Sequence, residues 1–161
     1  MSDLDLPDNC WMSPAGELAM GDVCQAVPMS VLADDRVEEV LVTDAEPAVA
    51  FVPARFSFAL VLGVLNGYAI LASIGTASGI PDAREFARLV ERGRTARSYA
   101  RLPAISNDEH EVWKGEAGVA FFSHVESFPA DETLTDLRVA SMNDASRDIL
   151  RARLARVLGG P

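Results

Sequence analysis

The chain has few of the residues that mark secreted, disulfide-rich proteins. Only two cysteines, Cys10 and Cys24, occur among its 161 residues. The sequence opens on Met1-Ser-Asp-Leu-Asp-Leu-Pro7, without the charged segment and apolar run of a secretory signal. Sparse cysteine and the missing signal are typical of a protein kept in a reducing compartment. We therefore expect a cytoplasmic location.

The spacing of the soft metal ligands disfavours a zinc site. Cys10 and Cys24 lie fourteen positions apart, and so do His110 and His124, the only two histidines. Ligand pairs in structural zinc sites usually lie about two to four residues apart, because one turn presents both. We expect no bound metal, and no motif indicates any other cofactor.

Common catalytic motifs are also missing. Lys114 is the only lysine, and no phosphate loop ending in Gly-Lys-Ser or Gly-Lys-Thr occurs. In Gly75-Thr-Ala-Ser-Gly79 the serine stands fourth, whereas a nucleophile elbow needs it in the middle of the five residues. These absences disfavour a kinase, a nucleotide hydrolase of the usual kind or a serine hydrolase.

The net charge of −10 is unevenly distributed. Residues 1–50 carry −10, residues 51–105 carry +4 and residues 106–161 carry −4. A basic middle segment is typical of an anion or nucleic-acid patch, but acidic ends can pair with it and mask it. Because nucleic-acid-binding domains usually have a clear basic excess, the net charge disfavours a nucleic-acid partner. The acidic first third leaves another alternative open, in which the chain mimics nucleic acid and inhibits an enzyme that binds it.

A long uncharged stretch runs from Phe56 to Pro81 and has enough apolar residues to span a membrane as a helix. In its middle stands Asn66-Gly67, between two strand-length apolar runs. Both residue types tolerate positive φ, and the pair is the strongest short-range signal for a β-hairpin. The sequence therefore predicts a buried central hairpin and no membrane partner.

Apolar runs and alternating patterns bounded by turn residues predict further strands at 22–27, 37–43, 48–52, 98–102 and 118–128. Pro81, Asp82 and Glu85 indicate an inserted helix near 81–93. An amphipathic helix is predicted near 144–158, stopped by Gly159-Gly160-Pro161.

These elements predict an α+β fold that is mainly antiparallel β, as an SH3-like or PemK-like barrel or a curled sheet with two helices. The length suits one globular domain. We expect that domain to cover residues 21–161, after an irregular N-terminal arm over residues 1–20.

One loop has the composition of an anion site. Gly75, Ser78 and Gly79 precede the predicted helix, whose free N–H groups and dipole attract anions. Arg84 and Arg88 follow on that helix. The same residues also suit a plain strand-to-helix turn.

Three segments together resemble the MazF/PemK family of small SH3-like mRNA-interferase toxins. They are Gly21-Asp22-Val23, Arg55-Phe-Ser-Phe-Ala-Leu-Val-Leu62 and Ala69-Ile-Leu-Ala-Ser-Ile-Gly-Thr76. The resemblance implies that Arg55 stabilises the phosphate transition state and assists proton transfer, while Thr76 or Ser73 positions the scissile phosphodiester. The family's proline after this arginine is Phe56 here, and the chain is strongly acidic. We therefore expect a relative that has kept a binding role and lost the nuclease activity.

Our leading hypothesis is a non-enzymatic protein-binding or regulatory domain, acting through a protein partner or as a homo-oligomer. It rests on the uncharged hairpin, which has more apolar residues than one sheet face needs. The first alternative is a metal-independent endoribonuclease toxin using Arg55, Thr76 and Ser73, and the second is the acidic nucleic-acid mimic. Thirteen arginines against one lysine hint at a GC-rich genome, and hence at a bacterial or phage origin.

Overall fold

The computed structural model describes residues 6–30, 54–75, 84, 87, 88, 91, 99–105 and 118–157. The strands are β1 (Trp11–Met12), β2 (Asp22–Ser30), β3 (Ala54–Leu65), β4 (Tyr68–Gly75), β5 (Tyr99–Leu102), β6 (Gly118–Pro129) and β7 (Arg138–Met142). The helices are α2 (Glu132–Asp136) and α3 (Asp144–Val157).

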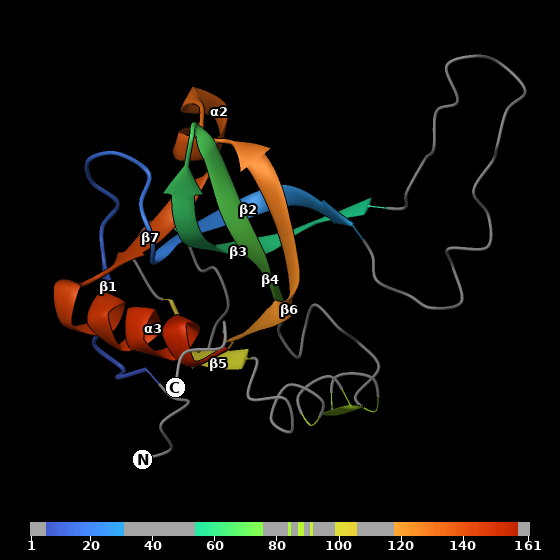
Figure 1. Ribbon diagram of the computed structural model, residues 1–161, viewed down its shortest axis with the longest axis vertical. Coiled ribbons are helices and arrows are strands. Elements are labelled where there is room, and N and C mark those ends of the chain that lie inside the picture. The colour runs from blue at the N-terminus through green and yellow to red at the C-terminus, as the bar shows by residue number, and fades with distance from the viewer. Residues whose placement is uncertain are drawn as a thin grey trace, which may run out of the picture.

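The strands form one antiparallel sheet in the order β1-β7-β2-β3-β4-β6-β5. The sheet curls into a half-barrel, with α3 along one end and α2 at the other (Figure 1). The predicted class, an α+β fold built on a curled antiparallel sheet, is confirmed.

The central hairpin forms as predicted. Leu65 at the end of β3 pairs with Tyr68 at the start of β4, which leaves a two-residue turn. Asn66 has φ 52° and Gly67 has φ 80°, and a type I′ turn requires both angles to be positive. Within the described residues, no helix is both long and apolar enough to cross a membrane.

Each face of the sheet carries a buried core, which explains the long uncharged stretch. On β3, Leu60 faces a core that includes Leu150 of α3, whereas its neighbours Ala59 and Val61 face a second core that includes Leu134 of α2. We call these the α3 core and the α2 core. Strands buried on both sides have apolar residues at almost every position.

Two irregularities adjust how strands face these cores. The β2–β3 register shifts between Cys24 and Val27, where Ala26 has φ 53°. This bulge lets Cys24 and Val27 both face the α2 core, although strict alternation would separate them. A second shift interrupts the β4–β6 pairing between Ala72 and Ser73.

No helix or strand is predicted from the sequence at residues 132–136, where the structure has α2. This helix is too short for an apolar period, and its signal is the cap: the Leu134 N–H donates to Oδ1 of Asp131 at 3.1 Å. In the predicted helix near 81–93, the described residues 84, 87, 88 and 91 are helical. The strands expected at 37–43 and 48–52 lie outside the described residues.

The N-terminal segment connects the two edges of the sheet. Trp11 and Met12 pair with β7 as β1. The indole N–H of Trp11 donates to the carbonyl of Pro103, just after β5, at 2.9 Å. The Leu6 N–H also donates to the carbonyl of Arg101 on β5, at 3.4 Å. Residues 6–12 therefore join the strands at opposite ends of the sheet order.

Replacing Gly67 with alanine should lower the free energy of unfolding by about 1 kcal/mol, because an L-residue is strained at this positive φ. A Cβ at position 67 would meet nothing within 4 Å, so the cost is conformational alone. Gly63→Ala is the matched control, since its Cβ also meets nothing within 4 Å and its φ lies outside the left-handed region. Urea unfolding of both variants checks this, and equal stabilities would contradict it.

Candidate functional site

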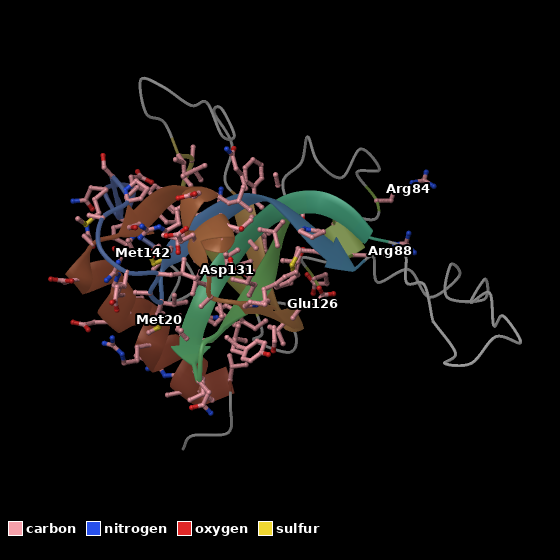
Figure 2. The ribbon with its side chains drawn as sticks, turned by 90° about the horizontal axis from the view of Figure 1, so that it is seen from above. Met20, Arg84, Arg88, Glu126, Asp131 and Met142 are labelled. Atoms are coloured by element: carbon pink, nitrogen blue, oxygen red, sulfur yellow. The ribbon has the colours of Figure 1, made fainter. Side chains whose placement is uncertain are left out.

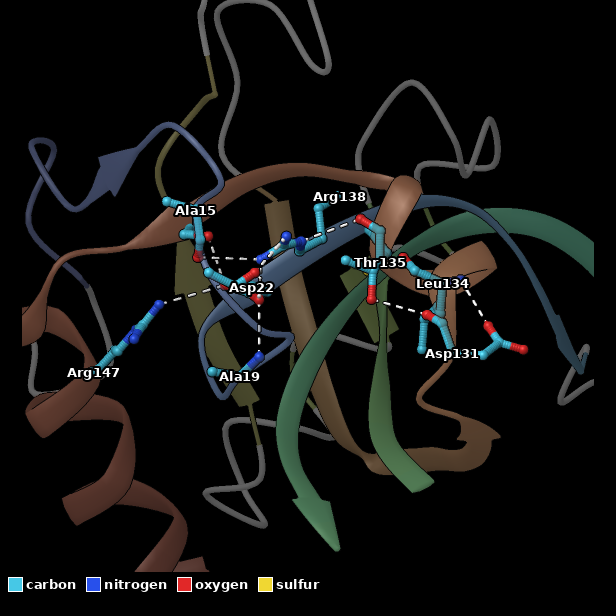
Figure 3. A network of polar contacts seen from close by, with 11 residues as sticks. Ala15, Ala19, Asp22, Asp131, Leu134, Thr135, Arg138 and Arg147 are labelled. Atoms are coloured by element: carbon cyan, nitrogen blue, oxygen red, sulfur yellow. Dashed lines mark hydrogen bonds and ion pairs between the residues drawn. The ribbon is translucent and has the colours of Figure 1, made fainter. Parts of the chain in front are cut away.

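Asp22 is a buried carboxylate at the start of β2, with a side chain only 1% exposed. The hydroxyl of Ser141 donates to its Oδ1 at 2.6 Å. The N–H of Ala19 donates to its Oδ2 at 2.9 Å. Figure 3 shows Ala19 donating to the carboxylate from the loop before β2.

Two arginines complete what we call the Asp22 network, made of Asp22, Arg138, Ser141 and Arg147. Nη1 of Arg138, on β7, lies 3.4 Å from Oδ2, and Nη2 of Arg147, on α3, lies 3.5 Å from Oδ1. Arg138 also donates to the carbonyls of Gly16 at 2.9 Å and Thr135 at 3.2 Å. The network thus ties β2 to the preceding loop, to β7 and to both helices.

The role of this network is structural. Both carboxylate oxygens already accept hydrogen bonds from the fold's own donors, so the site is an internal ion-pair cluster. Gly21 has φ 92°, and a Cβ there would lie 3.1 Å from side-chain atoms of Met142 and Arg147. The segment Gly21-Asp22-Val23 is therefore required by packing. The sequence pattern predicts a strand from Asp22 but not this ion-pair role. The local signal for the role is an aspartate after a glycine at the start of an apolar strand.

Asp22→Ala should lower the free energy of unfolding by about 3 kcal/mol, because it leaves the guanidinium of Arg138, 9% exposed, without its carboxylate. Asp148→Ala is the matched control. Asp148 pairs with Arg151 at 2.7 Å, but both side chains are mostly exposed, so the loss should stay below about 0.5 kcal/mol. Chemical denaturation of both variants checks this, and similar losses would show that Asp22 is not the anchor.

The residues carried over from the toxin resemblance lie on neighbouring strands. Arg55 is in β3 with its backbone opposite Met29, and Ser73 is in β4 opposite Ala59. Because Ala59 follows Arg55 by four residues, the two backbone positions lie about 13 Å apart along the strands. Ser73 is buried. Thr76 lies outside the described residues.

The predicted anion loop is described only in part. Gly75 ends β4, buried and paired with Val119 of β6. Ser78 and Gly79 lie outside the described residues. Arg84 and Arg88 are helical and exposed, and they lie on the side of the molecule away from Met142 (Figure 2).

The two cysteines are buried in different cores. Cys10 belongs to the α3 core and Cys24 to the α2 core, on opposite faces of the sheet. Burial raises the pKa of each thiol to about 12, because the charged thiolate is poorly solvated there. His110 lies outside the described residues. No group of three His, Cys, Asp or Glu residues suited to a metal ion occurs in the described part of the chain.

These thiols predict a loss of stability at alkaline pH. The pKa of each thiol is about 12 in the folded protein and close to the ordinary value of 9.0 in the unfolded chain. Between pH 9 and pH 12, the thiols therefore lose their protons in the unfolded chain but keep them in the folded protein. The stabilisation is complete below about pH 9 and falls by on the order of 1 kcal/mol per pH unit for each thiol above it. Urea unfolding at several pH values checks this against Cys10→Ala/Cys24→Ala. That double variant should show a flatter alkaline decline, and an unchanged slope would contradict the prediction.

Exposed apolar side chains lie at the turn of the central hairpin and on the neighbouring strand β6. Leu65, Tyr68 and Val125 are 68%, 52% and 44% exposed. Leu65 opposes Tyr68, and the β4–β6 register places Val125 opposite Ala72, so all three share the sheet face that carries the α3 core lower down. Helix α3 lies along the other end of that face (Figure 1).

We call this group, with the half-buried Ile70, the hairpin surface. The other residues of β3 and β6 that lie on this part of the face are Gly63, Ser127 and Pro129. No charged residue therefore stands on this part of the face. Three other large apolar side chains are exposed: Val64 on the other face of β3, Met12 on β1 and Ile149 on α3.

No protein-family model matches the chain, and no curated protein matches it in sequence. The curled antiparallel half-barrel is compatible with a small β-barrel fold.

Proposed function

We propose that this protein is a non-enzymatic protein-binding domain whose binding site is the hairpin surface. The observation that carries this proposal is the exposure of Leu65, Tyr68 and Val125 together, on a part of the sheet face without charged residues. Contiguous exposed apolar side chains mark interaction sites far more specifically than scattered ones.

The chemistry of the surface fits a protein partner. Removing apolar surface from water stabilises a complex by roughly 25 cal/mol per Å². Tyr68 adds a rigid aromatic side chain whose hydroxyl can hydrogen-bond at the rim, a combination enriched at interface hot spots. A sheet face without charged residues offers nothing to hold phosphates, and the net charge of −10 opposes a polyanion. We infer a partner with a complementary apolar surface, and a regulatory role exercised through that contact.

The test compares capture by three forms of the full chain from extract of its host, with and without nuclease. The forms are wild type, Leu65→Thr/Tyr68→Thr and the control Ile149→Gln. Threonine preserves strand propensity, so the double variant should fold and lose only apolar area. Wild type and control should retain the same stoichiometric protein, and the double variant should retain at least about tenfold less, as expected for hot-spot losses above 1 kcal/mol.

Two results would overturn this proposal. Retention of the same partner by the double variant would exclude the hairpin surface as the binding site. Nuclease-sensitive RNA in place of a protein, with RNA cleavage that Arg55→Ala abolishes, would establish the endoribonuclease alternative.

A further inference from the structure

The hairpin surface has the dimensions of one short helix. It lies on β4 and on the two strands beside it, β3 and β6, and along β4 it extends from Tyr68 to Ala72, which pairs with Val125. Four residues of strand measure about 13 Å, and the axes of three neighbouring strands span about 10 Å. A helix is about 10 Å wide and rises about 1.5 Å per residue, so slightly more than two turns cover this area.

The middle of this surface has room for another backbone to approach. Gly63, Ile70 and Ser127 form a row across the three strands, and Ile70 is half-buried. A Cβ added to Gly63 would meet nothing within 4 Å, so the space above it is open. In the next row, Leu65 and Tyr68 are exposed. The small residues of the middle row therefore let a partner come close while these two side chains pack against it.

A helix is the element that best suits this face. Pairing along a strand edge uses backbone groups and leaves the side chains of the face exposed. Burying Leu65, Tyr68 and Val125 therefore requires an element that packs over the face. Helix α3 packs over the other end of the same face, where Leu150 belongs to the α3 core (Figure 1). A partner helix beside α3 would extend the layer that already covers this side of the sheet.

The rim of the hairpin surface next to the turn is acidic. The Ala130 N–H donates to the carbonyl of Gly67 at 2.8 Å, and the start of α2 therefore lies beside the turn (Figure 1). Helix α2 and its cap carry three exposed carboxylates, Asp131, Glu132 and Asp136. No lysine or arginine occurs in residues 115–137. The electrostatic potential at this rim therefore favours a partner with basic residues beside its apolar side chains.

We propose that the hairpin surface binds an amphipathic helix of its partner, with an apolar stripe of about two turns and with lysine or arginine residues beside the stripe. The apolar residues of such a stripe recur at i, i+3, i+4 and i+7, the spacing by which helices dock on apolar surfaces. This inference rests on the proposed function, because it names the element and the charge that the same surface recognises.

Selection from a random peptide library tests both features. The library displays peptides of about 20 residues on phage, long enough to form a helix. Phage that bind Leu65→Thr/Tyr68→Thr are removed first, and the remainder is selected on the wild-type chain. The selected peptides, which depend on the hairpin surface, should have apolar residues at i, i+3, i+4 and i+7 and a net positive charge.

The outcomes of this selection separate the two proposals. Selected peptides in which apolar and polar residues alternate, or which carry a net negative charge, would overturn the helix inference and leave the hairpin surface as a binding site. Absence of any peptide that depends on the hairpin surface would also overturn the inference. Capture from host extract by wild type and by Leu65→Thr/Tyr68→Thr still decides the proposed function by itself.

Neutralising the rim tests the sign of the charge. In Glu132→Gln/Asp136→Asn, a selected peptide should bind at least about threefold more weakly at low salt, and the difference should disappear at high salt because salt screens exposed charges. Asp144→Asn/Asp148→Asn is the matched control, since it removes two exposed carboxylates from α3 at the other end of the sheet. Fluorescence titration measures both affinities, and equal weakening by the two double variants would contradict a local acidic rim.

Gly63→Leu distinguishes the docking of a helix from general apolar adhesion. Leucine adds apolar area, so a surface that merely adsorbs apolar chains would bind the selected peptide more tightly. On the proposed surface the leucine fills the open space above position 63, and binding should weaken by at least about tenfold. Urea unfolding confirms that the variant is folded. Unchanged or tighter binding by the folded variant would overturn the proposal.

Discussion

The buried carboxylate of Asp22 is the constraint on which the arrangement of the fold depends. Its partners come from residues more than a hundred positions away, Arg138 and Arg147, and from the loop just before it. Burying an ion costs several kcal/mol unless donors replace its hydration. That cost makes the arrangement specific, because only the native placement of β7 and α3 brings both guanidinium groups to the carboxylate.

The placement of the helices in turn decides which parts of the sheet are covered. The Asp22 network holds α3 to one end of the curled sheet through Arg147, and Arg138 connects it to α2 through Thr135. Helix α2 contributes Leu134 to the α2 core, while α3 covers only part of the opposite face. The exposure of Leu65 and Tyr68 therefore follows from where the one long described helix is anchored.

Local signals in the sequence determine the elements but not their assembly. Asn66-Gly67 predicts the hairpin because its φ requirement is local, and the extent of α3, which ends at Val157, follows from its apolar period and the glycines beyond. Helix α2 is too short to show a period. The Asp22 network could not be predicted from the sequence. Its arginines lie 116 and 125 residues from Asp22, and no local pattern shows which distant charged residues come into contact. For the candidate site, the uncharged stretch predicts the hairpin. It does not predict which hairpin residues stay exposed, because that depends on how much of the sheet face α3 covers.

Val125 belongs to the hairpin surface because of an irregularity in β6. The β4–β6 pairing breaks between Ala72 and Ser73, and beyond the break Val125 stands opposite Ala72 of the α3 core. Phe122, three residues earlier, packs against the same core, although strict alternation would put these two side chains on opposite faces of the sheet. Without the break, Val125 would face the α2 core, and the exposed apolar side chains on this face would be confined to the hairpin. The extent of the proposed binding surface therefore depends on this irregularity.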